Sequence, residues 1–188
     1  DDMCLVDRLK SSIPGITPEE LSKLDKLAQT AVFTSQGVPF IYAGEEVMRD
    51  KKGVHNSYES PDSINVIDWT RKLQHADVFA YYKGLIQLRK NHPAFRMGNA
   101  DLVRKHLAFL PVDGSNLLAY QLKDHANDDA WKEIIVVLNA RKQAAKLTIP
   151  EGKYTVVCKD GLINEKGLGT VYGAEVLIPA QSAMILYQ

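Results

Sequence analysis

Cysteine is scarce in this sequence of 188 residues, in which Cys4 and Cys158 are the only two. They lie far apart and outside any Cys-x-x-Cys spacing, so we expect two plain thiols, with neither a metal site nor a disulfide framework. Net charge is lacking as well, because 23 Lys and Arg residues balance 23 Asp and Glu residues. The chain therefore offers no field that would recruit nucleic acid or an anionic membrane, and we expect neither as a partner.

Long apolar runs are also missing. No stretch approaches the roughly 20 apolar residues that cross a bilayer, and no charged start followed by an apolar stretch resembles a signal peptide. The compartment stays open, since cytoplasm, periplasm and secretion are all possible. The chain starts with Asp1 and Asp2 rather than Met, which suggests a piece of a longer protein. With 45% apolar and 24% charged residues, the composition is that of a globular protein able to bury a core.

The first half carries helix signals on both sides of one short apolar run. Thr17 followed by Pro, Glu and Glu is a helix start, and the apolar stripe behind it continues to near Gly37. Residues 38–43, VPFIYA, are apolar on both faces and follow Gly37, which predicts a buried parallel strand. A second helix is predicted from about His75 to Asn91, stopped by Pro93.

Helix, strand, long loop and helix form a piece of a parallel α/β layer. One parallel strand cannot close a sheet, so we expect its neighbours to come from outside this sequence. After Phe95 the pattern changes to short strands with a period of two, separated by turn residues. The predicted strands span residues 107–112, 117–122, 133–138, 146–149, 154–158, 175–178 and 183–187. Antiparallel strands at this spacing predict a β-sandwich.

Three segments of the first half share a pattern known from one enzyme superfamily. Residues 37–46 read GVPFIYAGEE and residues 81–96 read YYKGLIQLRKNHPAFR, with NSY at 56–58 and PDSIN at 61–65 between them. The first two resemble the eighth barrel strand and eighth barrel helix of the α-amylase superfamily, glycoside hydrolase family 13. The segments between them are similar to its debranching subgroup, above all the type I pullulanases.

This resemblance implies an α/β plus all-β chain. Residues 1–96 would be the C-terminal remnant of a (β/α)8 TIM barrel, containing its helix 7, strand 8, long loop and helix 8. Residues 97–188 would be an antiparallel β-sandwich domain.

The same resemblance implies an activity. The parent protein would cleave α-1,6-glucosidic bonds of starch, glycogen or pullulan by a retaining mechanism and without a cofactor, with the α-glucan and the remainder of its own barrel as partners. Its nucleophile and general acid would follow the fourth and fifth barrel strands, which this sequence does not contain, so the chain alone is expected to be inactive. Two alternatives stay open: an α-1,4-acting hydrolase of the same superfamily, and a non-catalytic carbohydrate-binding or scaffold module.

The candidate site residues lie at the start of the chain and in the long loop. By the resemblance, Asp1 would be the third catalytic carboxylate, which stabilises the transition state. The loop from Glu45 to Trp69 is far longer than a usual βα connection, and such loops are commonly functional. Its amides, ring and carboxylate, at Asn56, Tyr58, Asp62 and Asn65, are groups that hold neutral sugars. The alternative is that its Asn and Asp side chains only pin the loop.

Structural roles are expected for other conspicuous residues. The adjacent carboxylates of Glu45 and Glu46 leave a strand toward opposite sides, which disfavours an acid/base pair. The basic residues Arg49, Lys51 and Lys52 are expected to form a solvated rim, and His92 to cap or pack a helix end. A sugar-binding sheet face would expose several aromatic rings, whereas the alternation along residues 154–158 and 183–187 favours their burial.

Overall fold

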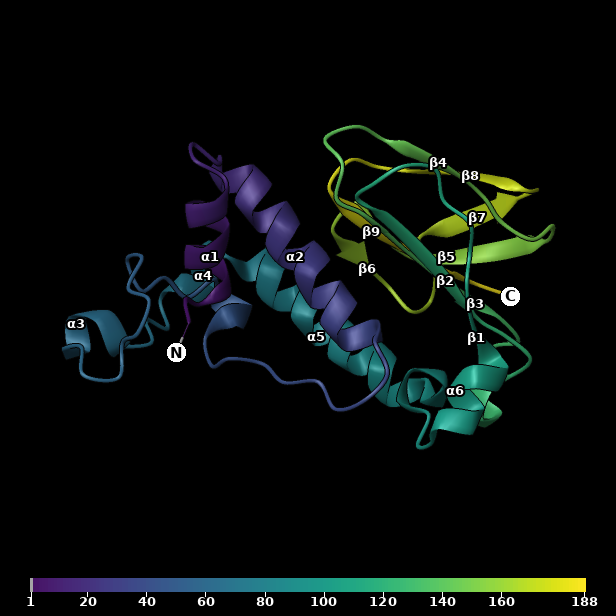
Figure 1. Ribbon diagram of the computed structural model, residues 1–188, viewed down its shortest axis with the longest axis horizontal. Helices are drawn as coiled ribbons and strands as arrows, with labels where there is room; N and C mark the ends of the chain where they lie inside the picture. The colour runs from purple at the N-terminus through teal and green to yellow at the C-terminus, as the bar shows by residue number, and fades with distance from the viewer. Residues whose placement is uncertain (1) are drawn as a thin grey trace.

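The computed structural model describes residues 2–188 and shows a layer of helices against an antiparallel β domain (Figure 1). The helical part contains α1 (Leu5–Ser12), α2 (Pro18–Thr34), η1 (Glu45–Val47), α3 (Asp62–Asn65), α4 (Arg71–Gln74), α5 (Ala76–Asn91), η2 (Pro93–Arg96) and α6 (Ala100–His106). Helices α2 and α5 lie side by side, with the β domain beyond one flank and the loop that carries α3 at the far end. No helix within residues 2–188 combines the length and apolar character that crossing a membrane requires.

Both long helices form where the sequence predicts them. The Thr17 hydroxyl accepts a hydrogen bond from the backbone N–H of Glu20 at 3.1 Å, which caps the first turn of α2. Helix α5 contains Gly84, a residue that usually weakens a helix interior by about 1 kcal/mol. A Cβ at this position would lie 2.3 Å from the Ile163 side chain, so glycine lets the β domain approach α5 closely.

The β domain consists of β1 (Leu107–Phe109), β2 (Leu117–Leu122), β3 (Ile134–Asn139), β4 (Ala145–Thr148), β5 (Lys153–Lys159), β6 (Leu162–Ile163), β7 (Gly169–Tyr172), β8 (Glu175–Ile178) and β9 (Ser182–Tyr187). The large sheet has the order β1-β2-β3-β9-β5-β6, with β7 also paired to β5, and β4 pairs with β8 in a second sheet. All of these pairings are antiparallel, as predicted. The short strands β6 and β7 and the helix α6 were not predicted.

The large sheet is buried on both faces, which explains its continuous apolar strands. Ile135 and Val137 of β3 point into a core shared with the small sheet, whereas Ile134 and Val136 pack into a second core with α2 and α5. Alternating residues of one strand therefore belong to different cores. The second core joins the helical layer to the β domain through apolar contact.

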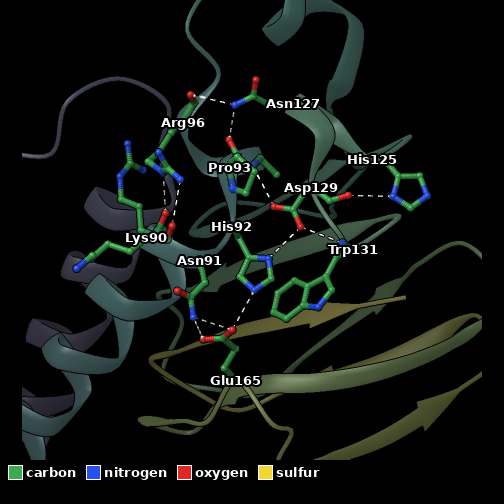
Figure 2. Close-up of polar contacts among 12 residues, drawn as sticks. Lys90, Asn91, His92, Pro93, Arg96, His125, Asn127, Asp129, Trp131 and Glu165 are labelled. Atoms are coloured by element: carbon green, nitrogen blue, oxygen red, sulfur yellow. Dashed lines mark hydrogen bonds and ion pairs between the residues drawn. The ribbon is translucent and has the colours of Figure 1, made fainter.

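A polar joint adds to this contact where α5 ends (Figure 2). His92 is buried, and its Nδ1 is hydrogen-bonded to the Asp129 carboxylate at 2.9 Å. The His92 ring stacks on Trp131 with 3.4 Å between centroids. The Asp129 carboxylate also accepts the backbone N–H groups of Ala94, at 3.1 Å, and Trp131, at 2.9 Å. His92 thus packs the helix end, as expected.

The prediction of a buried strand at Val38–Ala43 is wrong for this chain. Residues 38–42 have no regular secondary structure and Ala43 lies in a turn, while Val38 is 96% exposed and Phe40 86% exposed. The physical reason is that a parallel strand exists only through its neighbours, and residues 2–106 contain no other strand to pair with it.

The aromatic residues of the β domain divide between core and surface. Tyr154 is buried as the alternation predicts, and Tyr120 is buried as well. The Tyr187 ring stacks on that of Trp131 with 3.7 Å between centroids. Phe109 is 69% exposed, because β1 is an edge strand that ends there. Tyr172 of β7 is 70% exposed, but β7 pairs with β5 whereas β1 lies at the opposite end of the strand order. These two exposed rings therefore do not form the row that a sugar-binding face would need.

Candidate functional site

The long loop is tied to α1 by one buried carboxylate. Asp7 is only 2% exposed, and its two oxygens accept the backbone N–H groups of Lys51, at 2.7 Å, and Gly53, at 2.8 Å. The Cys4 thiol donates to the same carboxylate at 2.8 Å and lies 3.1 Å from the Arg49 carbonyl oxygen. The start of α1 and residues 49–53 therefore form one hydrogen-bonded unit.

Glu45 and Glu46 make contacts within the protein, in keeping with structural roles. The Gln29 amide of α2 donates to Glu45 at 3.0 Å, and the Glu46 carboxylate accepts the backbone N–H of Gly44 at 3.0 Å. Burial raises the pKa of Glu45. Behind it, burial also raises the pKa of Asp25 to about 7, although the Tyr82 hydroxyl donates to that carboxylate at 2.9 Å.

The expectation of a solvated basic rim is wrong for two of its three residues. Arg49 and Lys51 are 8% and 5% exposed, and their charged groups lie 5.2 and 5.1 Å from the centre of the Tyr42 ring. The ring face attracts both cations. The two terminal nitrogens of Arg49 donate to the carbonyl oxygens of Ala43 and Asn65, and Lys51 Nζ donates to Ser57 Oγ, whereas Arg49 Nε is buried without a partner among residues 2–188. Sequence reasoning missed this because the aromatic partner lies in the preceding apolar run; Lys52 alone is exposed.

Asn65 holds the loop together from inside. Its amide nitrogen donates to the carbonyl oxygens of Ser57, at 2.7 Å, and Ser60, at 2.9 Å, and its amide oxygen accepts from Lys51 Nζ at 3.0 Å. The pinning alternative therefore describes the Asn65 side chain.

The other three loop candidates face solvent. Asn56 and Asp62 are exposed, and Tyr58 is 78% exposed. The structure thus brings Asn56, Tyr58 and Asp62 onto the outer surface of a loop whose inner side is fixed by Asn65 and Lys51. Trp69, at the end of the loop, is 61% exposed.

Asp1 lies outside the described residues, and its predicted role is carried below as a proposal. The next residue, Asp2, forms an ion pair with Arg8 of α1 and lies 3.4 Å from His55 Nε2 of the loop. The Arg8 side chain holds the pKa of the Asp2 carboxyl below its usual range. The start of the described chain therefore lies beside the long loop. Within residues 2–188, no three His, Cys, Asp or Glu side chains gather as metal ligands.

A helical layer with a long polar loop at one end, joined to an antiparallel β domain, is the class of structure that these elements define. The family model described as "Pullulanase, all-beta domain" matches residues 103–161. The chain is 36% identical over 159 residues to the pullulanase of Bacillus subtilis strain 168, an alignment that covers 84% of this chain and 22% of that protein.

Solved structures give the same result over the full chain. The pullulanase from Bacillus acidopullulyticus matches with a TM-score of 0.95 and 47% identity, covering 100% of this chain and 23% of that one. The type I pullulanase of Bacillus subtilis, complexed with maltose, matches with a TM-score of 0.92 and 34% identity, covering 100% and 26%. The chain belongs to the pullulanase family, and it spans about a quarter of the length of these relatives.

Proposed function

We propose that the protein containing this chain is a debranching glycoside hydrolase that cleaves α-1,6-glucosidic bonds of pullulan, starch or glycogen. The similarity over 100% of the chain to pullulanase structures, one of them complexed with maltose, carries the proposal. The chain matches about a quarter of those proteins, so the activity belongs to the longer protein.

Residues 1–96 are proposed to complete a (β/α)8 barrel, and residues 97–188 to form its C-terminal β domain. Helices α2 and α5 would then be barrel helices 7 and 8, with residues 38–43 as barrel strand 8. The exposure of Val38 and Phe40 supports this assignment, because large apolar side chains rarely stay in water unless another surface covers them. The covering surface would be the remainder of the same barrel.

The long loop is proposed as part of the glucan-binding rim. Barrel active sites lie at the ends of the strands where the βα loops begin, and this loop begins directly after residues 38–43. Asn56, Tyr58 and Asp62 present exposed polar groups from it, whereas Asn65 supports the site by fixing the loop.

The proposed chemistry divides between this chain and the rest of the protein. A retaining glycosidase uses a nucleophile and an acid about 5 Å apart, and both would come from the remainder of the barrel. Asp1 would supply the third carboxylate, which binds the sugar more strongly as the transition state forms. The chain by itself then positions sugar without cleaving it.

Product analysis of the longer protein tests this function. With pullulan as substrate, cleavage of α-1,6 bonds releases maltotriose, while a linear α-1,4-glucan stays intact. The purified 188-residue chain serves as the control and should give no reducing ends above the blank. Cleavage of the linear glucan in place of pullulan would establish the α-1,4-acting alternative, and binding without cleavage by the longer protein would establish the non-catalytic one.

A further inference from the structure

Asp7 joins the two parts of the proposed site that lie far apart in the sequence. It follows the start of the chain by only a few residues, and its carboxylate holds the backbone of Lys51 and Gly53 in the long loop. We propose that Asp7 is a positioning residue for the reaction, which fixes the glucan-binding loop relative to the chain start that carries Asp1. This role rests on the proposed function.

The geometry at Asp7 requires a carboxylate. Two backbone N–H groups and the Cys4 thiol all donate to its two oxygens, and the side chain is 2% exposed. An amide in the same place would turn one –NH2 toward a backbone N–H and leave that donor buried without an acceptor. Asp7→Asn therefore changes almost no volume but removes one of the hydrogen bonds that hold the long loop to α1.

A chain of hydrogen bonds links Asp7 to the exposed candidates Asn56 and Tyr58. Lys51, held through its backbone by Asp7, uses its Nζ to bond Ser57 Oγ at 2.5 Å and Asn65 Oδ1 at 3.0 Å. Ser57 lies between Asn56 and Tyr58, so the two exposed side chains move with it. At the start of the described chain, the Asp2 carboxylate lies 3.4 Å from His55 Nε2 of the same loop.

Asp129, beside the C-terminal end of α5, provides a matched comparison with Asp7 (Figure 2). It is equally buried, at 3% exposure, and its carboxylate also accepts two backbone N–H groups, those of Ala94 and Trp131. Its partners are His92 at the end of α5, Ala94 of η2 and Trp131 in the turn before β3, and none of them belongs to the long loop. Loss of this carboxylate should lower the stability of the fold without displacing the glucan-binding loop.

The experiment compares Asp7→Asn with Asp129→Asn in the longer protein, at a temperature well below both melting midpoints. Asp7→Asn should lower kcat on pullulan by on the order of 100-fold with KM changed much less, as displacement of a positioned group does. Asp129→Asn should leave kcat within about twofold while lowering Tm. Hydrogen exchange supplies a readout apart from activity: the amides of Lys51 and Gly53 should exchange faster in Asp7→Asn and unchanged in Asp129→Asn.

The outcomes separate this inference from the proposed function. An active wild type with an unimpaired Asp7→Asn variant, or equal kcat losses in both variants, would overturn the role of Asp7 alone. A wild type without activity on pullulan would overturn the proposed function and this role with it. If Asp7→Asn does not fold, Asp7→Glu keeps the charge but moves it by one methylene, and wild-type kcat in that variant would equally refute the positioning role.

Discussion

Strand β3 and the segment at residues 38–42 are both short and apolar, yet they have opposite environments. Ile134 to Val137 of β3 are at most 1% exposed, because β2 and β9 pair with the strand and a core lies on each face. Val38 and Phe40 are 96% and 86% exposed in a segment without strand pairing. An apolar run therefore becomes a buried strand only where the chain supplies its neighbours. The β domain supplies these neighbours for β3, whereas residues 2–106 supply none for residues 38–42.

The same valine-to-aspartate change in the two regions should give the largest difference in the free energy of unfolding. Val136→Asp places an unpaired charge between sheet and helices, and we expect a loss of more than about 4 kcal/mol, enough to unfold the chain. Val38→Asp in the 188-residue chain should change the free energy of unfolding by less than about 0.5 kcal/mol. Urea titration of both variants measures this. Equal destabilisation would show that residues 38–42 are already packed in solution.

Phe40→Ala tests whether the remainder of the longer protein covers the exposed segment at residues 38–42. In the longer protein, where Phe40 is proposed to be buried as part of a barrel strand, truncation should cost about 3 to 5 kcal/mol. In the 188-residue chain the same substitution should cost less than about 0.5 kcal/mol, because the ring is exposed. Denaturant unfolding of both lengths gives the two values. A small loss in the longer protein would contradict the barrel assignment.

Asp25 tests a second weakness of the helical layer, a buried carboxylate whose Oδ2 has no hydrogen-bond partner. Burial raises its pKa to about 7, so the folded chain holds a proton that the unfolded chain has released above pH ~4. Between about pH 4 and pH 7 this group therefore makes the wild type less stable as the pH rises, by a few kcal/mol in all.

Asp25→Asn mimics the protonated acid and should remove this pH dependence. We expect it to be more stable than the wild type at pH 8 and close to it at pH 4, measured by urea titration at both values. Asp129→Asn is the control with the opposite sign. Hydrogen bonding from His92 opposes burial and lowers the pKa of Asp129, so its contribution is present at neutral pH and lost as the pH falls into the acid range. An Asp25→Asn variant that is destabilised equally at both pH values would refute the assignment.

The smallest effect expected is on substrate affinity. Tyr58→Ala in the longer protein should raise KM for pullulan several-fold, about 1 kcal/mol, with Tm unchanged because the ring is 78% exposed. Phe109→Ala removes a similarly exposed ring from the β domain and should leave KM unaltered. If both substitutions raise KM equally, the sugar contacts extend to the β domain, and the loop is not the distinguishing feature.

Local signals in the sequence predicted much of the fold. Thr17 before Pro18 begins α2, Pro93 ends the region of α5, and the alternating strands of the β domain lie within a residue or two of their predicted bounds in most cases. These features depend on neighbours in the sequence, such as caps, turn residues and periodicity. Strands β6 and β7 escaped prediction because they are short, and much of their length is exposed, which leaves no apolar pattern.

The candidate site was predicted only in outline. The exposed positions of Asn56, Tyr58 and Asp62 follow from a polar loop, but the burial of Arg49 and Lys51 depends on the Tyr42 ring, to which no sequence pattern pairs them. Asp7 gave no signal at all, since a lone acidic residue in a first helical turn is ordinary.

The helices, the antiparallel strands and the resemblance to pullulanases follow from the sequence alone, because each depends on short-range periodicity or on contiguous motifs. Three features instead depend on the folded arrangement: Asp7 and Asn65 fix the loop, His92 and Asp129 join the helical layer to the β domain, and residues 38–42 stay uncovered. The contacts of Asp7 with the loop and of His92 with Asp129 join segments 37 to 46 residues apart, and those of Asn65 span 5 to 14 residues of an irregular loop. Hydrogen bonds of both kinds follow from how the chain packs rather than from a periodic pattern in the sequence.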